Sequence, residues 1–95
     1  MAEYSKESGG KPPLHLIPPE HLDVVACVLD YGRRKYYEWS WLDTPIPRYE
    51  LIGAAMRHIN AYNAGINYDN ESGLHHLAHA ITNLMFIFSY DYRGL

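Results

Sequence analysis

The chain has 95 residues, of which 47% are hydrophobic, and its formal net charge is −3 with neutral histidines. This length allows one small domain, and the hydrophobic content excludes disorder by composition. The negative charge argues against non-specific binding of duplex nucleic acid, which needs a basic face. The single cysteine excludes an internal disulfide, and no apolar run is long enough to cross a membrane. We therefore expect a soluble, cytoplasmic protein.

The polar N-terminal segment, residues 1–13, is rich in glycine and proline and predicts a flexible arm that includes Lys11. The apolar residues Leu14, Leu16 and Ile17 follow, and we expect them to anchor this arm on the body. Residues 14–95 then predict a single all-α domain, because helical periodicity recurs in three segments and no strand pattern is evident.

The first helix is predicted from Pro19 to about Tyr37, since proline is favoured in the first helical turn. Its last turns carry Arg33, Arg34 and Lys35 next to two tyrosines. These cations either compensate the helix dipole or bind phosphate beside rings that stack on a base.

An aromatic loop with Trp39 and Trp41 is predicted at residues 38–47, and a second helix follows from Arg48 to about Asn63. The apolar positions of this helix that we expect to be buried are Leu51, Ile52, Ala55, Met56, Ile59 and Tyr62. A small-residue strip with Arg57 lies opposite, formed by Gly53, Ala54 and Ala61, and it is either plain surface or a contact for another backbone.

The third helix is predicted from about Asn70 to Tyr90, with Asp69, Asn70 and Ser72 as N-cap candidates. One apolar stripe is expected to face the core: Leu74, Leu77, Ala78, Ile81, Leu84, Met85 and Phe88. A second stripe lies on the opposite face and is expected to stay free for function: Ser72, His76, His79, Asn83, Phe86 and Tyr90.

The histidines of the second stripe, His76 and His79, stand one turn apart and leave three interpretations open. They are compatible with a metal site completed by Asp69, Glu71 or His58. They equally suit hydrogen bonding to a phosphate or base edge, or purely structural contacts. Carboxylate pairs such as Glu20 with Asp23 occur, but none makes the double E-x-x-E/E-x-x-D constellation that holds magnesium in helical nucleotide pyrophosphohydrolases.

Several motifs in fixed order resemble a phage-borne family, the N-terminal part of dATP/dGTP diphosphohydrolase. They are G-G-K-P-x-L-x-L-I-P-P-E from Gly9, Y-G-x-x-K-Y from Tyr31, Arg48-Tyr49 with Arg57-His58, and D-x-E-S-G-x-x-H-L-A-H-A-x-x-N from Asp69. The resemblance implies an all-α domain, distantly similar to MazG-like NTP pyrophosphohydrolases, with a purine nucleotide as ligand. Carried over by motif, it points to Lys11, Lys35, Arg57, His58, Glu71, His76, His79 and Asn83.

Two functions follow from the resemblance together with the residues. Because the magnesium-binding carboxylates are absent, we rank first a protein that binds and sequesters a purine nucleotide signal of host anti-phage defence, cyclic dinucleotides included. The alternative is a metal-dependent dATP/dGTP pyrophosphohydrolase. Sequestration needs no cofactor, whereas hydrolysis would use Mg²⁺ or Mn²⁺. Residues expected to contact the nucleotide are Lys11, Arg33, Lys35, Tyr36, Trp39, Trp41, Arg57, His58, His76, His79 and Asn83.

Self-association is also expected, because a three-helix unit of this size rarely covers all of its aromatic surface. We predict a dimer or tetramer in the cytoplasm of the host cell. The second stripe of the third helix and the two loop tryptophans would lie under the partner copy, with ligand sites at or beside the interface.

Overall fold

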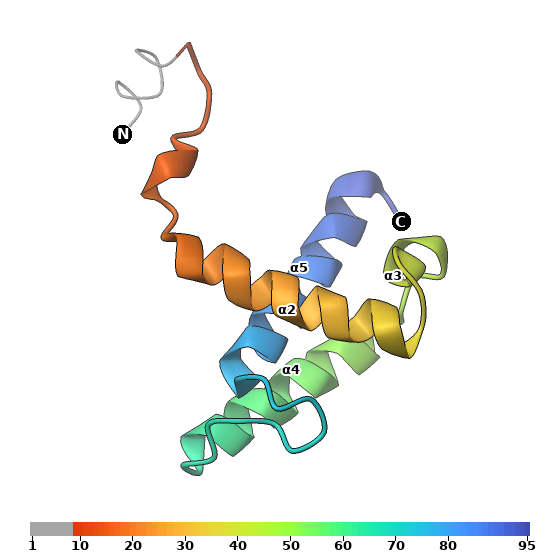
Figure 1. Cartoon of the computed structure of the whole chain (residues 1–95). Coiled ribbons are helices and arrows are strands. Elements are labelled where there is room, and N and C mark those ends of the chain that lie inside the picture. Colours follow the sequence, from red (N-terminus) through yellow and green to blue (C-terminus); the bar gives the residue numbers. More distant parts are fainter. Residues whose placement is uncertain (1–8) are drawn as a thin grey trace.

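The computed structural model describes residues 9–95, and these fold almost entirely into helices (Figure 1). The elements are η1 (Leu14–Leu16), α2 (Pro19–Lys35), α3 (Ser40–Asp43), α4 (Arg48–Asn63) and α5 (His76–Arg93). Within residues 9–95 there is no strand, and the one β-bridge joins Tyr68 to His75. The all-α prediction is confirmed, with three long helices and two short ones.

The middle of the fold is α5, which packs on α4 along one side and on α2 along another. In Figure 1, α2 crosses in front of α5, and α4 lies below both. Proline starts two of these helices: Pro18 precedes α2 and Pro47 precedes α4, as the sequence predicts. None of the described helices is both long enough and apolar enough to span a membrane.

The buried core is small and partly polar. Its apolar members are Val28, Leu51, Ala55, Ala78, Ala80 and Tyr90. Three polar side chains of α5, His76, His79 and Thr82, are buried with them, and Thr82 is only 1% exposed. Every described buried side-chain N or O atom has a hydrogen-bond partner, so their burial leaves no polar group unsatisfied.

The orientation predicted for α5 is therefore wrong. Its stripe of histidine, threonine and tyrosine faces α2 and α4, whereas Ile81, Leu84 and Phe88 face solvent. The histidines and Tyr90 find hydrogen-bond partners on other segments, and Thr82 donates to the Ala78 carbonyl of α5 itself. Of the predicted core stripe, only Ala78 is buried. A partner copy consequently cannot cover His76, His79 or Tyr90, as the prediction of self-association assumed.

The buried arc of α4 is also narrower than predicted. Leu51 and Ala55 are buried, but Ile52, Met56, Ile59 and Tyr62 are all exposed. Of the long helices, only α5 packs extensively against α4, so one narrow side of the helix is covered.

The start of α5 lies at His76 rather than at Asn70. The predicted caps instead form a turn: the Oδ2 atom of Asp69 accepts hydrogen bonds from the backbone N–H of Ser72 at 2.8 Å and from its hydroxyl at 2.9 Å. Asp and Ser stabilise such turns as readily as helix caps, which explains the error. The true N-cap is His75, whose Nδ1 accepts from the Leu77 N–H at 3.0 Å.

The segment before α2 points away from the rest of the molecule (Figure 1). Leu14, Leu16 and Ile17 are all exposed, so the prediction that they anchor the arm is wrong. Of the predicted arm, residues 1–8 lie outside the described part of the chain, and Lys11 is exposed near its end.

Candidate functional site

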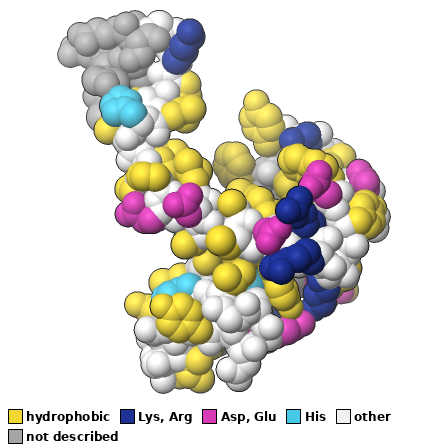
Figure 2. All heavy atoms as spheres, viewed as in Figure 1, with side chains coloured by type: hydrophobic (Ala, Val, Ile, Leu, Met, Phe, Trp, Pro, Cys, Tyr) yellow, Lys and Arg dark blue, Asp and Glu magenta, His cyan; other side chains and the backbone are white. Residues whose placement is uncertain are grey.

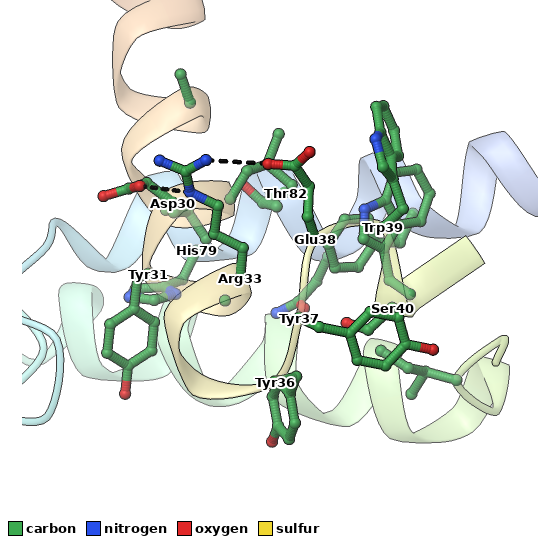
Figure 3. Close-up of a pocket in the computed structure, with 18 residues that line it drawn as sticks. Asp30, Tyr31, Arg33, Tyr36, Tyr37, Glu38, Trp39, Ser40, His79 and Thr82 are labelled. Carbon is green, nitrogen blue, oxygen red and sulfur yellow. Dashed lines mark hydrogen bonds and ion pairs between the residues drawn. The ribbon is translucent and has the colours of Figure 1, made fainter. Parts of the chain in front are cut away.

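A pocket of about 560 Å³ lies between the C-terminal half of α2, the aromatic segment that follows it, and α5 (Figure 3). This volume is within the usual range for small-molecule sites. Six of the residues predicted to contact a nucleotide line it: Arg33, Tyr36, Trp39, Trp41, His79 and Asn83. Residues from three separate parts of the chain therefore meet around one hollow.

The aromatic wall of the pocket is held in place by stacking and by a tyrosine hydroxyl. The Trp41 ring stacks on Phe86 with centroids 4.4 Å apart, and Trp39 lies 6.1 Å from Trp41. The buried Tyr90 hydroxyl donates to the Trp41 carbonyl and accepts from the Ile46 N–H, which fixes the ends of this segment on α5. Trp39 itself adopts a left-handed backbone conformation with φ of 66° and is 57% exposed.

Arg33 at the pocket rim is held between two carboxylates (Figure 3). Its Nε donates to Asp30 at 2.8 Å and its Nη1 to Glu38 at 2.9 Å. The Glu38 hydrogen bond, followed by the Asp30 one, raises the pKa of Arg33. Figure 2 shows cations and carboxylates side by side over the C-terminal half of α2, so positive charge on this face is largely paired.

A histidine cluster lies behind the pocket, where α4, α5 and the 64–75 loop meet. The Nδ1 atoms of His58 and His76 are 2.8 Å apart, and the His58 ring stacks on His79 with centroids 4.5 Å apart. The Nε2 atom of His79 lies 2.6 Å from the Ser72 hydroxyl, which in turn donates to Asp69. One ligand atom from each of His58, Asp69 and His76 falls within 4.8 Å of the others.

Burial lowers the pKa of two of these imidazoles, His58 and His79. It lowers the pKa of His58, and repulsion from His79 and His76 lowers that pKa further. Burial also lowers the pKa of His79, against the opposing attraction of Asp69. Burial alone would raise the pKa of Asp69, but the hydrogen bonds from Ser72 and the charges of the nearby imidazoles bring that pKa below its ordinary value. The lowered pKa values favour neutral His58 and His79 beside an ionised Asp69 carboxylate at pH 7.

An ion pair connects the histidine loop to the end of α2. Lys35 Nζ donates to Glu71 Oε1 at 2.8 Å, and both side chains are exposed. This bond lowers the pKa of Glu71, and a hydrogen bond from Tyr31 lowers it further. Because Glu71 is engaged by Lys35, the structure brings only His76 and Asp69 of the predicted metal set together with His58, and it leaves His79 bonded to Ser72.

Five predicted ligand residues do not line the pocket: Lys35, His58 and His76, which belong to the ion pair and the histidine cluster described above, and Lys11 and Arg57. Lys11 is on the projecting segment. Arg57 instead lines a second hollow of about 460 Å³, together with Gly53 and Ala54 of the small-residue strip. Asn83 lines both hollows.

Asp30, Glu38 and Thr82 of the pocket were not predicted from the sequence, whereas Tyr37 belongs to the predicted pair of tyrosines and Ser72 to the predicted polar stripe. Asp30 and Glu38 carried a usable signal, since they flank the cations of α2 at helical and near-helical spacing. The role of Ser72 depends on the loop geometry, which the sequence pattern did not reveal.

Comparison with known proteins assigns the chain to a family. A protein of Salmonella phage PMBT28 named dATP/dGTP diphosphohydrolase is 44% identical over 79 residues, which are 83% of this chain and 27% of the phage protein. The chain thus spans about a quarter of the length of that relative. No solved structure matches it. The family described as dATP/dGTP diphosphohydrolase, N-terminal, matches residues 1–94, and the chain belongs to this family.

Proposed function

We propose that this domain binds a purine deoxynucleotide in the aromatic pocket and serves dATP/dGTP diphosphohydrolysis. The observation that carries the proposal is the meeting of Trp39, Trp41 and Arg33 around one hollow of about 560 Å³. The name of the phage relative supports hydrolysis, the second of the two functions derived from the sequence, over sequestration.

The base would stack on the exposed indole of Trp39, next to the Trp41–Phe86 stack. Stacking of a base on an aromatic ring contributes roughly 1–3 kcal/mol and tolerates either purine. Asn83 and Thr82 lie in the same lining and offer an amide and a hydroxyl to the base edge.

The phosphates would replace a carboxylate at Arg33. Arg33 already binds Asp30 and Glu38, so an incoming phosphate competes with these groups for the same guanidinium donors. A phosphate can accept two hydrogen bonds from one guanidinium and carries more charge than a carboxylate. Nucleotide binding would therefore replace a carboxylate by a phosphate at Arg33, and the carboxylates of Asp30 and Glu38 would compete with the nucleotide.

A divalent ion for hydrolysis would enter with the nucleotide. Mg²⁺ prefers oxygen ligands and is commonly held through substrate phosphates and one or two carboxylates. Asp30 and Glu38 at the rim are the carboxylates of the described pocket in a position to complete such a shell. Mn²⁺ suits the same oxygen donors, so both ions belong in the assay.

The experiment uses tryptophan fluorescence, because the chain has two tryptophans and both line the pocket. Addition of dGTP or dATP is expected to change the emission saturably. Trp39→Ala should weaken binding roughly tenfold or more through loss of stacking. Arg33→Gln should weaken binding by roughly tenfold, since it removes a charge-assisted hydrogen bond.

The competing carboxylate gives the sharpest variant. With EDTA present, so that no divalent ion engages the carboxylate, Glu38→Gln frees one side of Arg33 and should tighten nucleotide binding about two- to fivefold, as for a surface ion pair. Glu20→Gln, an equally exposed glutamate at the start of α2, is the matched control and should leave binding unchanged. Weaker binding by Glu38→Gln would contradict the exchange at Arg33.

Product analysis separates the two functions. Incubation with dGTP and Mg²⁺ or Mn²⁺, followed by chromatography, is expected to yield the monophosphate and pyrophosphate. Recovery of intact dGTP from protein that binds it tightly would favour sequestration instead.

A further inference from the structure

The histidine cluster has the construction of a metal site. His58 comes from α4, His76 from the first turn of α5, and Asp69 from the loop between these helices. Three segments that are separate in the sequence thus each direct one nitrogen or oxygen donor into the same half-buried space. Two neutral imidazoles and a carboxylate are common ligands of divalent transition metals.

The facing imidazoles are the first argument. Their Nδ1 atoms lie 2.8 Å apart, so the single hydrogen between them belongs to one ring and is accepted by the other. Moving that proton to Nε2 of the same ring leaves two Nδ1 lone pairs aimed at a shared point. A cation placed there replaces the proton as the bridge, and both rings stay neutral with no net proton release.

The surroundings of these donors are the second argument. Ser72 donates two hydrogen bonds to Asp69 Oδ2, which fixes the carboxylate and leaves Oδ1 outside these bonds. Because the Ser72 hydroxyl proton goes to Asp69, the 2.6 Å contact places the His79 proton on Nε2, donated to Ser72. His79 then stacks on His58 with an interplanar angle of 8° and restricts its rotation. Outer groups that orient the ligands in this way are typical of metal centres.

We propose that His58, His76 and Asp69 bind one divalent transition-metal ion of the zinc type, with His79 and Ser72 as positioning residues. Zinc bonds of about 2.0–2.2 Å place neighbouring ligand atoms roughly 3.3 Å apart. The imidazole pair therefore opens by a few tenths of an ångström while Asp69 moves inward. The mixed nitrogen and oxygen set disfavours Mg²⁺, which takes oxygen ligands. Because the site joins α4 to α5, a bound metal ion would stabilise the fold of a domain whose core is small.

The test is metal titration of the whole chain without nucleotide, so its outcome is independent of the proposed hydrolysis. Protein stripped with EDTA is titrated with Co²⁺, whose visible absorption reports tetrahedral coordination. We expect one Co²⁺ per chain, displacement by Zn²⁺, and no response to Mg²⁺. A hundredfold excess of Zn²⁺ over its Kd should raise the Tm by on the order of 10 °C.

Variants assign the ligands. His58→Gln and Asp69→Asn should each weaken Co²⁺ binding by about a hundredfold and change the absorption bands. Ser72→Ala should weaken binding on the order of tenfold with the bands retained, as expected for a positioning residue. His21→Gln, an exposed histidine near the start of α2, is the control and should bind as the wild type does. Circular dichroism establishes that each variant is folded.

Asp69→Asn is expected to fold, because the Asn side-chain oxygen still accepts hydrogen bonds from Ser72. If His58→Gln does not fold, the wild-type stoichiometry and Asp69→Asn decide the proposal. Absence of Co²⁺ bands in the wild-type chain, or unchanged bands in Asp69→Asn, would overturn it and leave a hydrogen-bonded histidine network with a purely structural role.

Discussion

The two faces of α5 invert the usual relation between polarity and burial. The inward face carries His76, His79, Thr82 and Tyr90, and each of these polar groups has a partner. The outward face carries Ile81, Leu84 and Phe88, and Phe88 is 72% exposed. The comparison teaches that, in a domain this small, specific hydrogen bonds between segments decide which face packs. The apolar face then lies free.

The largest expected effect comes from the apolar contact beneath the inward face. Leu51 of α4 is 3% exposed, and Leu51→Ala should lower the free energy of unfolding by about 2–4 kcal/mol through the lost contacts and the cavity. Urea denaturation measures this loss. The same truncation on the outward face, Leu84→Ala, should cost less than about 1 kcal/mol. Equal losses at the two positions would mean that the outward face is also packed.

A smaller effect is expected at Tyr90, whose hydroxyl connects α5 to the aromatic segment. Tyr90→Phe leaves the Trp41 carbonyl and the Ile46 N–H without this partner and should cost about 1–3 kcal/mol. Thermal denaturation measures the cost, and the tryptophan emission should shift because Trp41 loses its anchor. Tyr92→Phe, on an exposed side chain, is the control and should change neither quantity.

As the pH falls, the histidines of the inward face should lose their contribution to stability before the carboxylates do. In the native state the pKa of His58 and that of His79 lie below the ordinary value of 6.5, so the unfolded chain binds more protons. This contribution to stability is complete above pH 6.5 and is lost as the pH falls through the lowered values. The lowered pKa values of Asp69 and Glu71 act only at more acidic pH.

The measurement is urea denaturation between pH 7.5 and pH 5 with EDTA present, so that no metal contributes. His79→Gln should flatten the profile over this range. A stability that stays level from pH 7.5 to pH 5 in the wild-type chain would contradict neutral burial of the histidines.

The smallest effect on stability is expected on the outward face. In the single chain, Phe88→Glu places a charge where the ring already meets water, so the free energy of unfolding at protein concentrations that keep the chains apart should change by less than about 0.5 kcal/mol. Light scattering of the same protein tests the expected self-association. The wild type should have at least twice the mass of one 11.0 kDa chain, and Phe88→Glu should have the mass of one. An unchanged oligomer would exclude this face as the contact.

Local signals in the sequence were sufficient to predict the starts of the two helices that begin at a proline or directly after one. Pro19 is the first residue of α2, where proline is tolerated, and Pro47 directly precedes Arg48, the first residue of α4. The start of α5 was missed because Asp69 and Ser72 are equally suited to a turn. Which stripe of α5 faces inward was missed because periodicity identifies faces without identifying their neighbours.

The sequence indicated which types of residue form the candidate site, but not how these residues are arranged in space. Tryptophan, arginine and histidine in a compact chain indicate ligand contacts, and four such residues, Arg33, Trp39, Trp41 and His79, do share the pocket. The stack of Trp41 on Phe86 and the approach of His58 to His76 join residues far apart in the sequence. Such pairings depend on how helices cross, and no local pattern encodes them.

The left-handed backbone of Trp39 has a consequence for attempts to stabilise the domain. A residue with a β-carbon in this conformation costs about 1–2 kcal/mol relative to glycine, a sizeable part of the stability of a small domain. A library selected for thermal resistance alone should therefore enrich glycine at position 39. The selected variants would be more stable but would lack the indole on which we propose that the base stacks. At position 39, glycine would therefore favour thermal stability and tryptophan would favour nucleotide binding.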